Sequence, residues 1–253
     1  MKRFDFTILL GLAIGLAAIT FGAYLENLKL SFLWHPTALL IVGGGTLGAV
    51  IVKRGLSGVK SAGQAFWQLR HQENEDLHKA ELARLAWLAQ SARKKGVRVY
   101  EVYADDCRDA LLSQGLLLVA EQADAGLTRD ILLRRLDWED EYGLQDVQTF
   151  EAAGGFAPTF GILGAVIGLI SVLRVIDQPD ALGTGIATAF VATIYGIGIA
   201  NLFFFPIASR LRARHENRIK RREEIIAVIL ALAANEGPRA IANRFNLKIS
   251  VNS

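Results

Sequence analysis

Four long segments of this 253-residue chain contain no Asp, Glu, Lys or Arg. They cover residues 6–25, 30–52, 152–173 and 181–209, and they contain 20, 23, 22 and 29 residues. About 20 apolar residues are enough for an α-helix to cross the hydrocarbon core of a bilayer. Four fully buried helices of a soluble protein would be the alternative, and the repetition of the pattern disfavours it. The sequence therefore predicts an all-α, polytopic membrane protein with four transmembrane helices.

The first segment also follows two basic residues, Lys2 and Arg3, as the core of a secretory signal peptide does. It is longer than the 7–15 residues typical of such a core, and no convincing small-residue cleavage pattern follows it. We interpret it as an uncleaved first span.

Basic residues next to the segments predict the topology. Lys2 and Arg3, Lys53 and Arg54, and the arginines of residues 210–214 all lie on one side of the membrane if there are four spans. The positive-inside rule places that side in the cytoplasm, so we expect a bacterial inner-membrane protein with both termini cytoplasmic. The predicted parts are a first transmembrane hairpin (1–52, with spans at 6–25 and 30–52), a helical cytoplasmic domain (53–151), a second hairpin (152–209, with spans at 152–173 and 181–209) and a basic, helical cytoplasmic tail (210–253).

The cytoplasmic segments have helical patterns. Leucines and alanines recur every three or four residues over 79–95, and Gly96 follows as a left-handed helix cap. A second helix is predicted over 127–136 with Thr128 as its cap, and residues 142–151 are expected to run straight into the third span. The apolar stretch 225–234 is too short to cross a bilayer, so it should pack against the other cytoplasmic helices and end at Gly237.

The spans lack an ionisable group of their own, except for His35 near the outer edge. A protein that moves ions through a bilayer normally needs such a group. Either the chain conducts nothing, or a partner chain contributes the carboxylate. Small-residue pairs at positions 11/15, 164/168 and 192/196 permit close helix contact. Residues 43–48 formally match a GxGxxG nucleotide motif, but no acidic residue follows at the required spacing, so helix packing is preferred.

Two prolines lie within the predicted third and fourth spans. Pro158 and Pro206 both fall within roughly 10 Å of the cytoplasmic boundary at 1.5 Å of rise per residue. Each removes a backbone donor and tends to kink its helix, although membrane helices also tolerate prolines without consequence. Thr159, Thr193 and Tyr195 add polar groups, which either face a helix interface or an aqueous path or bond back to their own helix.

At these residues the chain resembles the MotA/PomA family of flagellar motor stator subunits. The strongest block is GGFAPTFGILGAVIGLI at residues 154–170, followed by GIATAFVATIYG at 185–196, and HPTALLIVGGGT at 35–46 is similar to the first-hairpin pattern of the family. The resemblance implies that Pro158 and Pro206 are the two functional prolines. It also implies that Thr193 lies on the ion path. Thr159 and Tyr195 are candidates for the same ion path and its conformational coupling because of their polar groups. Sodium-type relatives typically have threonine where this chain has Ala165, which favours protons.

The resemblance also implies the partners. Five copies of the chain would surround two copies of a MotB-like, single-span, peptidoglycan-binding subunit that supplies the ion-binding aspartate. Arg93, Lys94, Lys95 and Glu101 match the charges that contact the rotor switch complex in the family. Membrane lipid is the remaining partner.

Two other functions remain as alternatives. An energiser of the ExbB/TolQ kind, for outer-membrane transport or gliding, usually has three spans, whereas four are predicted here. A passive, non-conducting membrane scaffold is the second. An enzyme is not expected, because no nucleophile–base pair, phosphate loop or metal cluster is recognisable. No cofactor or metal is therefore expected, and a net charge of +3 gives no reason to expect nucleic acid.

Overall fold

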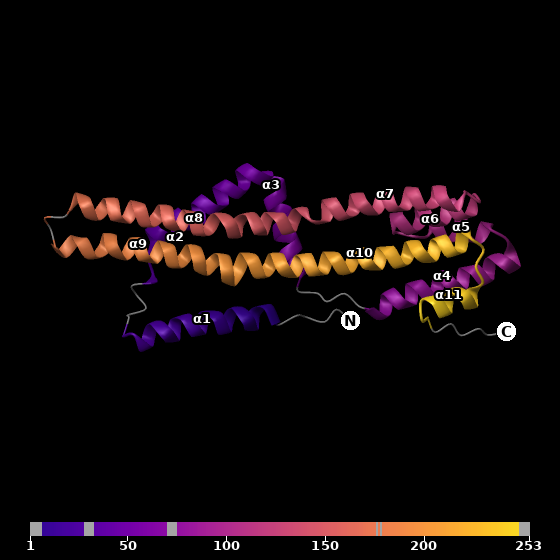
Figure 1. Cartoon of the computed structure of the whole chain (residues 1–253), viewed down its shortest axis with the longest axis horizontal. Coiled ribbons are helices and arrows are strands. Elements are labelled where there is room, and N and C mark those ends of the chain that lie inside the picture. Colours follow the sequence, from indigo (N-terminus) through magenta and orange to yellow (C-terminus); the bar gives the residue numbers. More distant parts are fainter. Residues whose placement is uncertain (1–6, 28–32, 70–74, 176, 178, 248–253) are drawn as a thin grey trace. The chain divides into compact units, whose positions relative to one another are not determined.

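The computed structural model describes residues 7–27, 33–69, 75–175, 177 and 179–247, and all regular elements in this part of the chain are helices (Figure 1). The predicted span starts at residues 6 and 30 and the last six residues of the tail lie outside the described residues. The chain divides into two compact units. Unit 1 comprises residues 1–72 and 144–213, and unit 2 comprises residues 73–143 and 214–253.

Unit 1 contains the apolar helices. They are α1 (Thr7–Leu25), α2 (Pro36–Leu39), α3 (Gly45–Gln68), α8 (Gln145–Arg174), α9 (Pro179–Ile199) and the start of α10 (Phe205–Ala233). Within the described residues, three helical segments are long and apolar enough to cross a membrane: Pro36–Gln68, Ala125–Arg174 and Leu182–Ala233. Helix α1 has 19 residues and is about 28 Å long at 1.5 Å per residue, close to the roughly 30 Å of hydrocarbon that a span must cross. The four predicted spans all fall on these helices, and the all-α membrane fold is confirmed.

Two π-helical turns interrupt the spans. Leu40–Gly44 lies between α2 and α3, and Ala200–Phe204 lies between α9 and α10. Residues 38–42, which precede the glycine motif, are thus helical rather than a strand, so the motif lacks the strand that a nucleotide site requires. The second π turn immediately precedes Pro206. Proline cannot donate to the carbonyl four residues back, and a local change of hydrogen-bond register accommodates that missing bond.

Helix α3 bends sharply where its apolar part ends. Gly55 has a φ of +70° and a ψ of 170° inside the helix, a conformation that glycine adopts at little cost. The bend follows directly after Lys53 and Arg54, the charges that end the second predicted span. The rest of the helix, from Leu56 on, thus changes direction at the predicted membrane boundary.

Unit 2 is a small helical bundle. Its helices are α4 (Glu75–Lys95), α5 (Arg98–Asp105), α6 (Ala110–Ala120), α7 (Ala125–Gly143), the remainder of α10 and α11 (Pro238–Arg244). The core is aliphatic, and its largest fully buried side chains are Leu85, Leu88, Leu111, Leu112, Leu116, Leu132, Ile229, Leu232 and Ile241. The predicted packing of residues 225–234 is confirmed, because this stretch supplies Ile225, Ile226, Val228 and Ile229 to the core. Gly96 has the predicted left-handed conformation, with φ +86°.

One local prediction is wrong in detail, and a second is confirmed. Thr128 does not cap the helix after residue 125; it is fully buried inside α7. Asp124 caps it instead, because the backbone N–H groups of Gly126 and Leu127 donate to its Oδ2 at 2.9 and 3.2 Å. Asp124 directly precedes the helix, so its carboxylate can accept from the unpaired N–H groups of the first turn, which is the usual role of an N-cap residue. Residues 142–151 run into the third span as predicted: α8 begins at Gln145, Leu144 keeps helical dihedral angles, and the helical segment Ala125–Arg174 is continuous.

Candidate functional site

Small residues bring α8 and α9 into backbone contact, and the two helices lie side by side (Figure 1). A Cβ atom on Gly196 would lie 2.6 Å from the carbonyl oxygen of Ala157 and 3.1 Å from the Cα atom of Pro158. One on Gly168 would lie 2.8 Å from the backbone of Gly185 and of Ala189. The predicted small-residue pairs at 164/168 and 192/196 therefore form this contact, as close packing in membranes requires.

The two prolines lie at different levels along this helix pair. Pro158, half-buried inside α8, is opposite Gly196, and the ring of Phe205 reaches back to Gly154. Because α8 and α9 run antiparallel, the ten residues from Gly196 to Pro206 separate the prolines by about 15 Å along the helix axis. Pro206 is exposed and lines a cavity of about 250 Å³ that also touches Leu12 of α1. The two missing backbone donors thus lie at different levels of unit 1.

The predicted polar positions mostly satisfy their hydroxyl donors locally. Thr159 is exposed and donates to the carbonyl of Phe156 at 2.7 Å, while half-buried Thr193 donates to that of Ala189 at 3.2 Å. These are bonds within one helix, which was one of the two predicted alternatives. Both oxygens keep lone pairs that can accept a further bond. Ala165 is half-buried on α8, one residue after Gly164 of the contact with α9.

Tyr195 links α9 to the segment before α2. Its hydroxyl donates to the Leu33 carbonyl and accepts from the His35 N–H at 3.3 Å. The His35 side chain extends the link through Nε2, 3.2 Å from the Thr188 hydroxyl, while its buried Nδ1 has no partner among the described residues. The tyrosine therefore anchors the first hairpin to the second, a role that its position in the sequence did not reveal.

Charged side chains gather where α8 begins. Arg54 donates through Nε to the Thr149 hydroxyl at 3.1 Å and through Nη2 to the Gln145 carbonyl at 2.5 Å. Arg212 pairs with Glu151 at 2.8 Å, and the Lys53 ammonium lies 5.8 Å from the centre of the Phe156 ring. These contacts connect α3, α8 and α10 at the predicted cytoplasmic boundary. Sequence reasoning used the basic residues only for topology and missed their partners.

The four predicted rotor-contact residues lie on the corner between α4 and α5. Arg93, Lys94 and Lys95 form the last turn of α4 and are exposed, and Glu101 is in the first turn of α5. The Glu101 side chain is 46% exposed and lies 3.9 Å from Arg98. Arg93 also donates to the carbonyl of Asn235 at 3.2 Å, just beyond the end of α10. Burial raises the pKa of the neighbouring Tyr100, and the Arg93 charge opposes that shift.

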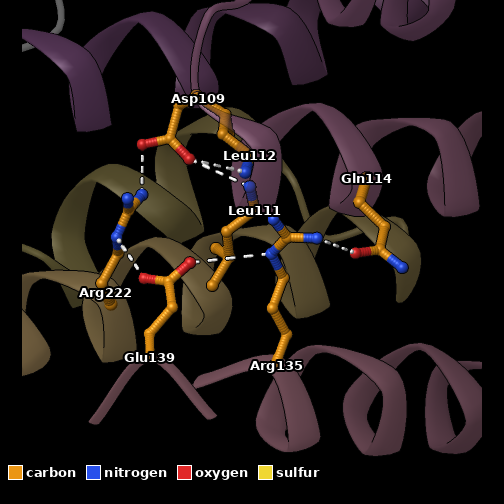
Figure 2. Close-up of polar contacts among 7 residues, drawn as sticks. All are labelled: Asp109, Leu111, Leu112, Gln114, Arg135, Glu139 and Arg222. Atoms are coloured by element: carbon orange, nitrogen blue, oxygen red, sulfur yellow. Dashed lines mark hydrogen bonds and ion pairs between the residues drawn. The ribbon is translucent and has the colours of Figure 1, made fainter. Parts of the chain in front are cut away.

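An ion-pair network that the sequence did not indicate holds α6, α7 and α10 together (Figure 2). Asp109 accepts from the N–H groups of Leu111 and Leu112 at 3.0 and 3.2 Å and pairs with Arg222. Arg222 also contacts Glu139 at 3.3 Å, and Glu139 in turn contacts Arg135 at 3.6 Å. Asp109 is both the N-cap of α6 and an ion-pair partner, so one side chain couples a local cap to tertiary structure.

Replacing Asp109 tests this double role. Asp109→Ala removes the cap and the ion pair, and we expect a loss of about 1–3 kcal/mol in stability, because a cap contributes about 1 kcal/mol and a charged hydrogen bond somewhat more. Asp109→Asn keeps a good cap acceptor and loses only the ion pair, so its melting temperature should fall less. Thermal unfolding of the detergent-solubilised chain followed by circular dichroism measures both. Equal melting temperatures for the two variants would contradict the assignment.

Together, these features define a helical membrane protein with two apolar hairpins and a charged helical bundle. Two family models match it: the Motility protein A N-terminal model covers residues 9–96, and the MotA/TolQ/ExbB proton channel family model covers residues 103–224. Similar proteins include motility protein A of Bacillus subtilis (strain 168), 33% identical over 95% of this chain and 89% of the relative. Chemotaxis protein PomA of Vibrio alginolyticus is 31% identical over 94% of this chain and 92% of the relative.

Solved structures agree with this similarity. A chain of the flagellar MotAB stator complex from Bacillus subtilis superposes with a TM-score of 0.82 at 33% identity, over 95% of this chain and 94% of that one. A chain of C. jejuni MotAB shares the fold, with a TM-score of 0.84 at 24% identity over 98% and 97% of the two chains. The chain therefore belongs to the MotA/TolQ/ExbB proton channel family and, within it, to the motility protein A group of flagellar stator subunits.

Proposed function

We propose that this chain forms the ion path of a flagellar stator only together with a MotB-like subunit. The observation that carries the proposal is the kind of side chain that the spans of unit 1 contain. Its closest helix pair, α8 and α9, meets through glycine and alanine, and the spans contain no acidic or basic side chain between their ends except His35. An ion crossing this region needs an ionisable group, which a partner helix would supply. The similarity to a chain of the flagellar MotAB stator complex supports such a partner.

The assembly that we propose is a homopentamer in the bacterial inner membrane with both termini in the cytoplasm. The basic residues beside the spans support the orientation. Protons are the proposed ion, because Ala165 offers no hydroxyl where sodium-type relatives typically have threonine. No resident cofactor or covalent chemistry is needed for this role, in which the chain acts as a channel-forming coupling subunit rather than as an enzyme.

The coupling is proposed to run through the prolines. Protonation of the partner carboxylate removes a charge from a low-dielectric site and changes which arrangement of the surrounding helices is favoured. Pro158 interrupts the hydrogen-bond ladder of α8, and Pro206 interrupts that of α10 about 15 Å further along the helix pair. Helices bend most readily at such interruptions. Thr159 and Thr193, whose oxygens can still accept hydrogen bonds, are the proposed lining of the path on these helices.

The rotor contact is proposed at the α4–α5 corner. Lys94 and Lys95 are exposed and Glu101 is nearly half exposed, so charges of both signs are available to a complementary surface on the rotor switch complex. Exposed ion pairs are individually weak, which suits a contact that must repeatedly form and break.

Charge reversal at Glu101 tests this contact. Glu101→Lys should reduce torque several-fold, measured as the rotation speed of tethered cells, because it replaces attraction to the rotor by repulsion. The structural cost should be small, because its ion pair with Arg98 is long and exposed. Glu216→Lys makes the same charge change at an exposed site of α10, about 25 Å along the helix from the end that Arg93 contacts, and serves as the control. Equal speeds for the two variants, at equal membrane levels, would remove Glu101 from the rotor contact.

A further inference from the structure

Unit 2 has a cavity that the proposed stator function does not use. Its volume is about 470 Å³, and it lies between α4, α5 and α10. Four arginines line it: Arg84, Arg218, Arg221 and Arg222. The volume falls within the range of about 300–1,000 Å³ that is typical of small-molecule sites.

The charge of the lining favours an anion. Only two carboxylates, Glu81 and Asp109, line the cavity with the four guanidinium groups. Asp109 is already paired with Arg222, and His78, also on the wall, lies 2.7 Å from Glu224. Arg84, in contrast, is exposed and has no hydrogen bond or ion pair among the described residues. A cation at the mouth of the cavity is therefore available to a ligand.

The wall also has an apolar part. Leu77 and Ile225 line the cavity from α4 and α10, and the half-buried ring of Tyr103 lines it from α5. The guanidinium group of an arginine can donate two parallel hydrogen bonds to the oxygens of a phosphate. An aromatic ring offers a face on which a planar heterocycle can stack. A single phosphate ion would leave most of this volume unfilled. The combination suits a molecule with a phosphorylated end and a flat, less polar body.

We propose that this cavity binds a phosphorylated, nucleotide-like metabolite and that its occupancy biases the α4–α5 corner. Tyr103 lies on α5 two residues after Glu101, so a ligand held against its ring contacts the helix that carries a proposed rotor charge. The site is separate from the corner itself, because Arg84 and Arg93 are nine residues apart on α4, about 14 Å along the helix. A ligand anion that competes with Asp109 for Arg222 also weakens the ion-pair network between α6, α7 and α10 (Figure 2).

The proposal goes beyond the stator function and is tested without it, by isothermal titration of the purified full-length chain in detergent. The probes are ATP, inorganic pyrophosphate and inorganic phosphate. We expect ATP to bind saturably, more tightly than pyrophosphate, and less tightly as salt screens the arginines. Arg84→Ala should weaken ATP binding about tenfold, the effect of losing one charged hydrogen-bonding group. Arg84→Lys keeps the positive charge but loses the paired donors of the guanidinium group, so its affinity for ATP should lie between those of the native chain and of Arg84→Ala.

Arg129→Ala is the matched control, because Arg129 is an exposed arginine of α7 that does not line the cavity. Its affinity for ATP should equal that of the native chain, and all three variants should melt at the native temperature. No saturable binding of any probe at millimolar concentration would overturn the proposal, as would equal affinities for Arg84→Ala and Arg129→Ala. Pyrophosphate binding as tightly as ATP would refute the proposed stacking of a heterocycle on Tyr103.

Discussion

Gly196→Ala is expected to abolish accumulation of the folded chain in the membrane. The added Cβ atom would lie 2.6 Å from the backbone oxygen of Ala157, and backbone atoms of a packed helix cannot turn aside as a flexible side chain does. The α8–α9 pair must separate, and overpacking of this kind costs about 1–3 kcal/mol or more, a large part of a typical stability of 5–15 kcal/mol. Membrane levels by immunoblot and the melting temperature in detergent measure the effect.

Gly198→Ala is the control for this experiment. It makes the same substitution two residues along the same helix, where a Cβ atom meets nothing within 4 Å. Its helix should be slightly favoured, because alanine has a higher helix propensity than glycine. Membrane levels of Gly196→Ala equal to those of Gly198→Ala would show that α8 and α9 do not approach as closely as described.

Pro158→Ala should abolish swimming while the chain still assembles. Alanine restores the backbone N–H that can donate to the Gly154 carbonyl four residues back, so α8 loses its interruption and becomes stiffer. Stability should be unchanged or higher, since a helix bond is gained. Swimming speed, membrane level and co-purification with the MotB-like partner are measured together.

Pro238→Ala provides the comparison, because Pro238 occupies the first turn of α11, where a missing N–H group costs nothing. Cells with this variant should swim at the native speed. Native swimming of Pro158→Ala cells would exclude the proposed coupling through α8 and would favour a passive scaffold.

The sequence was sufficient to predict the membrane fold because the signals are local and repeated. Uncharged segments of 20 or more residues identified the spans, and the three-to-four-residue periodicity before Gly96 identified α4. The small-residue pair of Gly164 and Gly168 indicated that α8 can approach another helix closely, although not which one. Each of these features depends only on neighbours within one helix, so no knowledge of the fold was needed.

Contacts between distant segments could not be predicted in the same way. Tyr195 is 162 residues from Leu33, to which it donates, and Arg222 is 113 residues from Asp109. Periodicity cannot pair such residues. The π turn before Pro206 and the Asp124 cap were missed for a different reason: several local conformations compete at these positions with small energy differences, and packing decides among them.

Proton flux into proteoliposomes tests the central claim most directly. Vesicles containing this chain alone, the chain with its MotB-like partner, and the chain with a partner whose transmembrane Asp is replaced by Asn are compared under one pH gradient, with a sodium gradient as a parallel arm. We predict proton flux only where the chain and the intact partner are both present, and no dependence on sodium. Equal proton flux through the chain alone would contradict the claim that the ion-binding group comes from the partner.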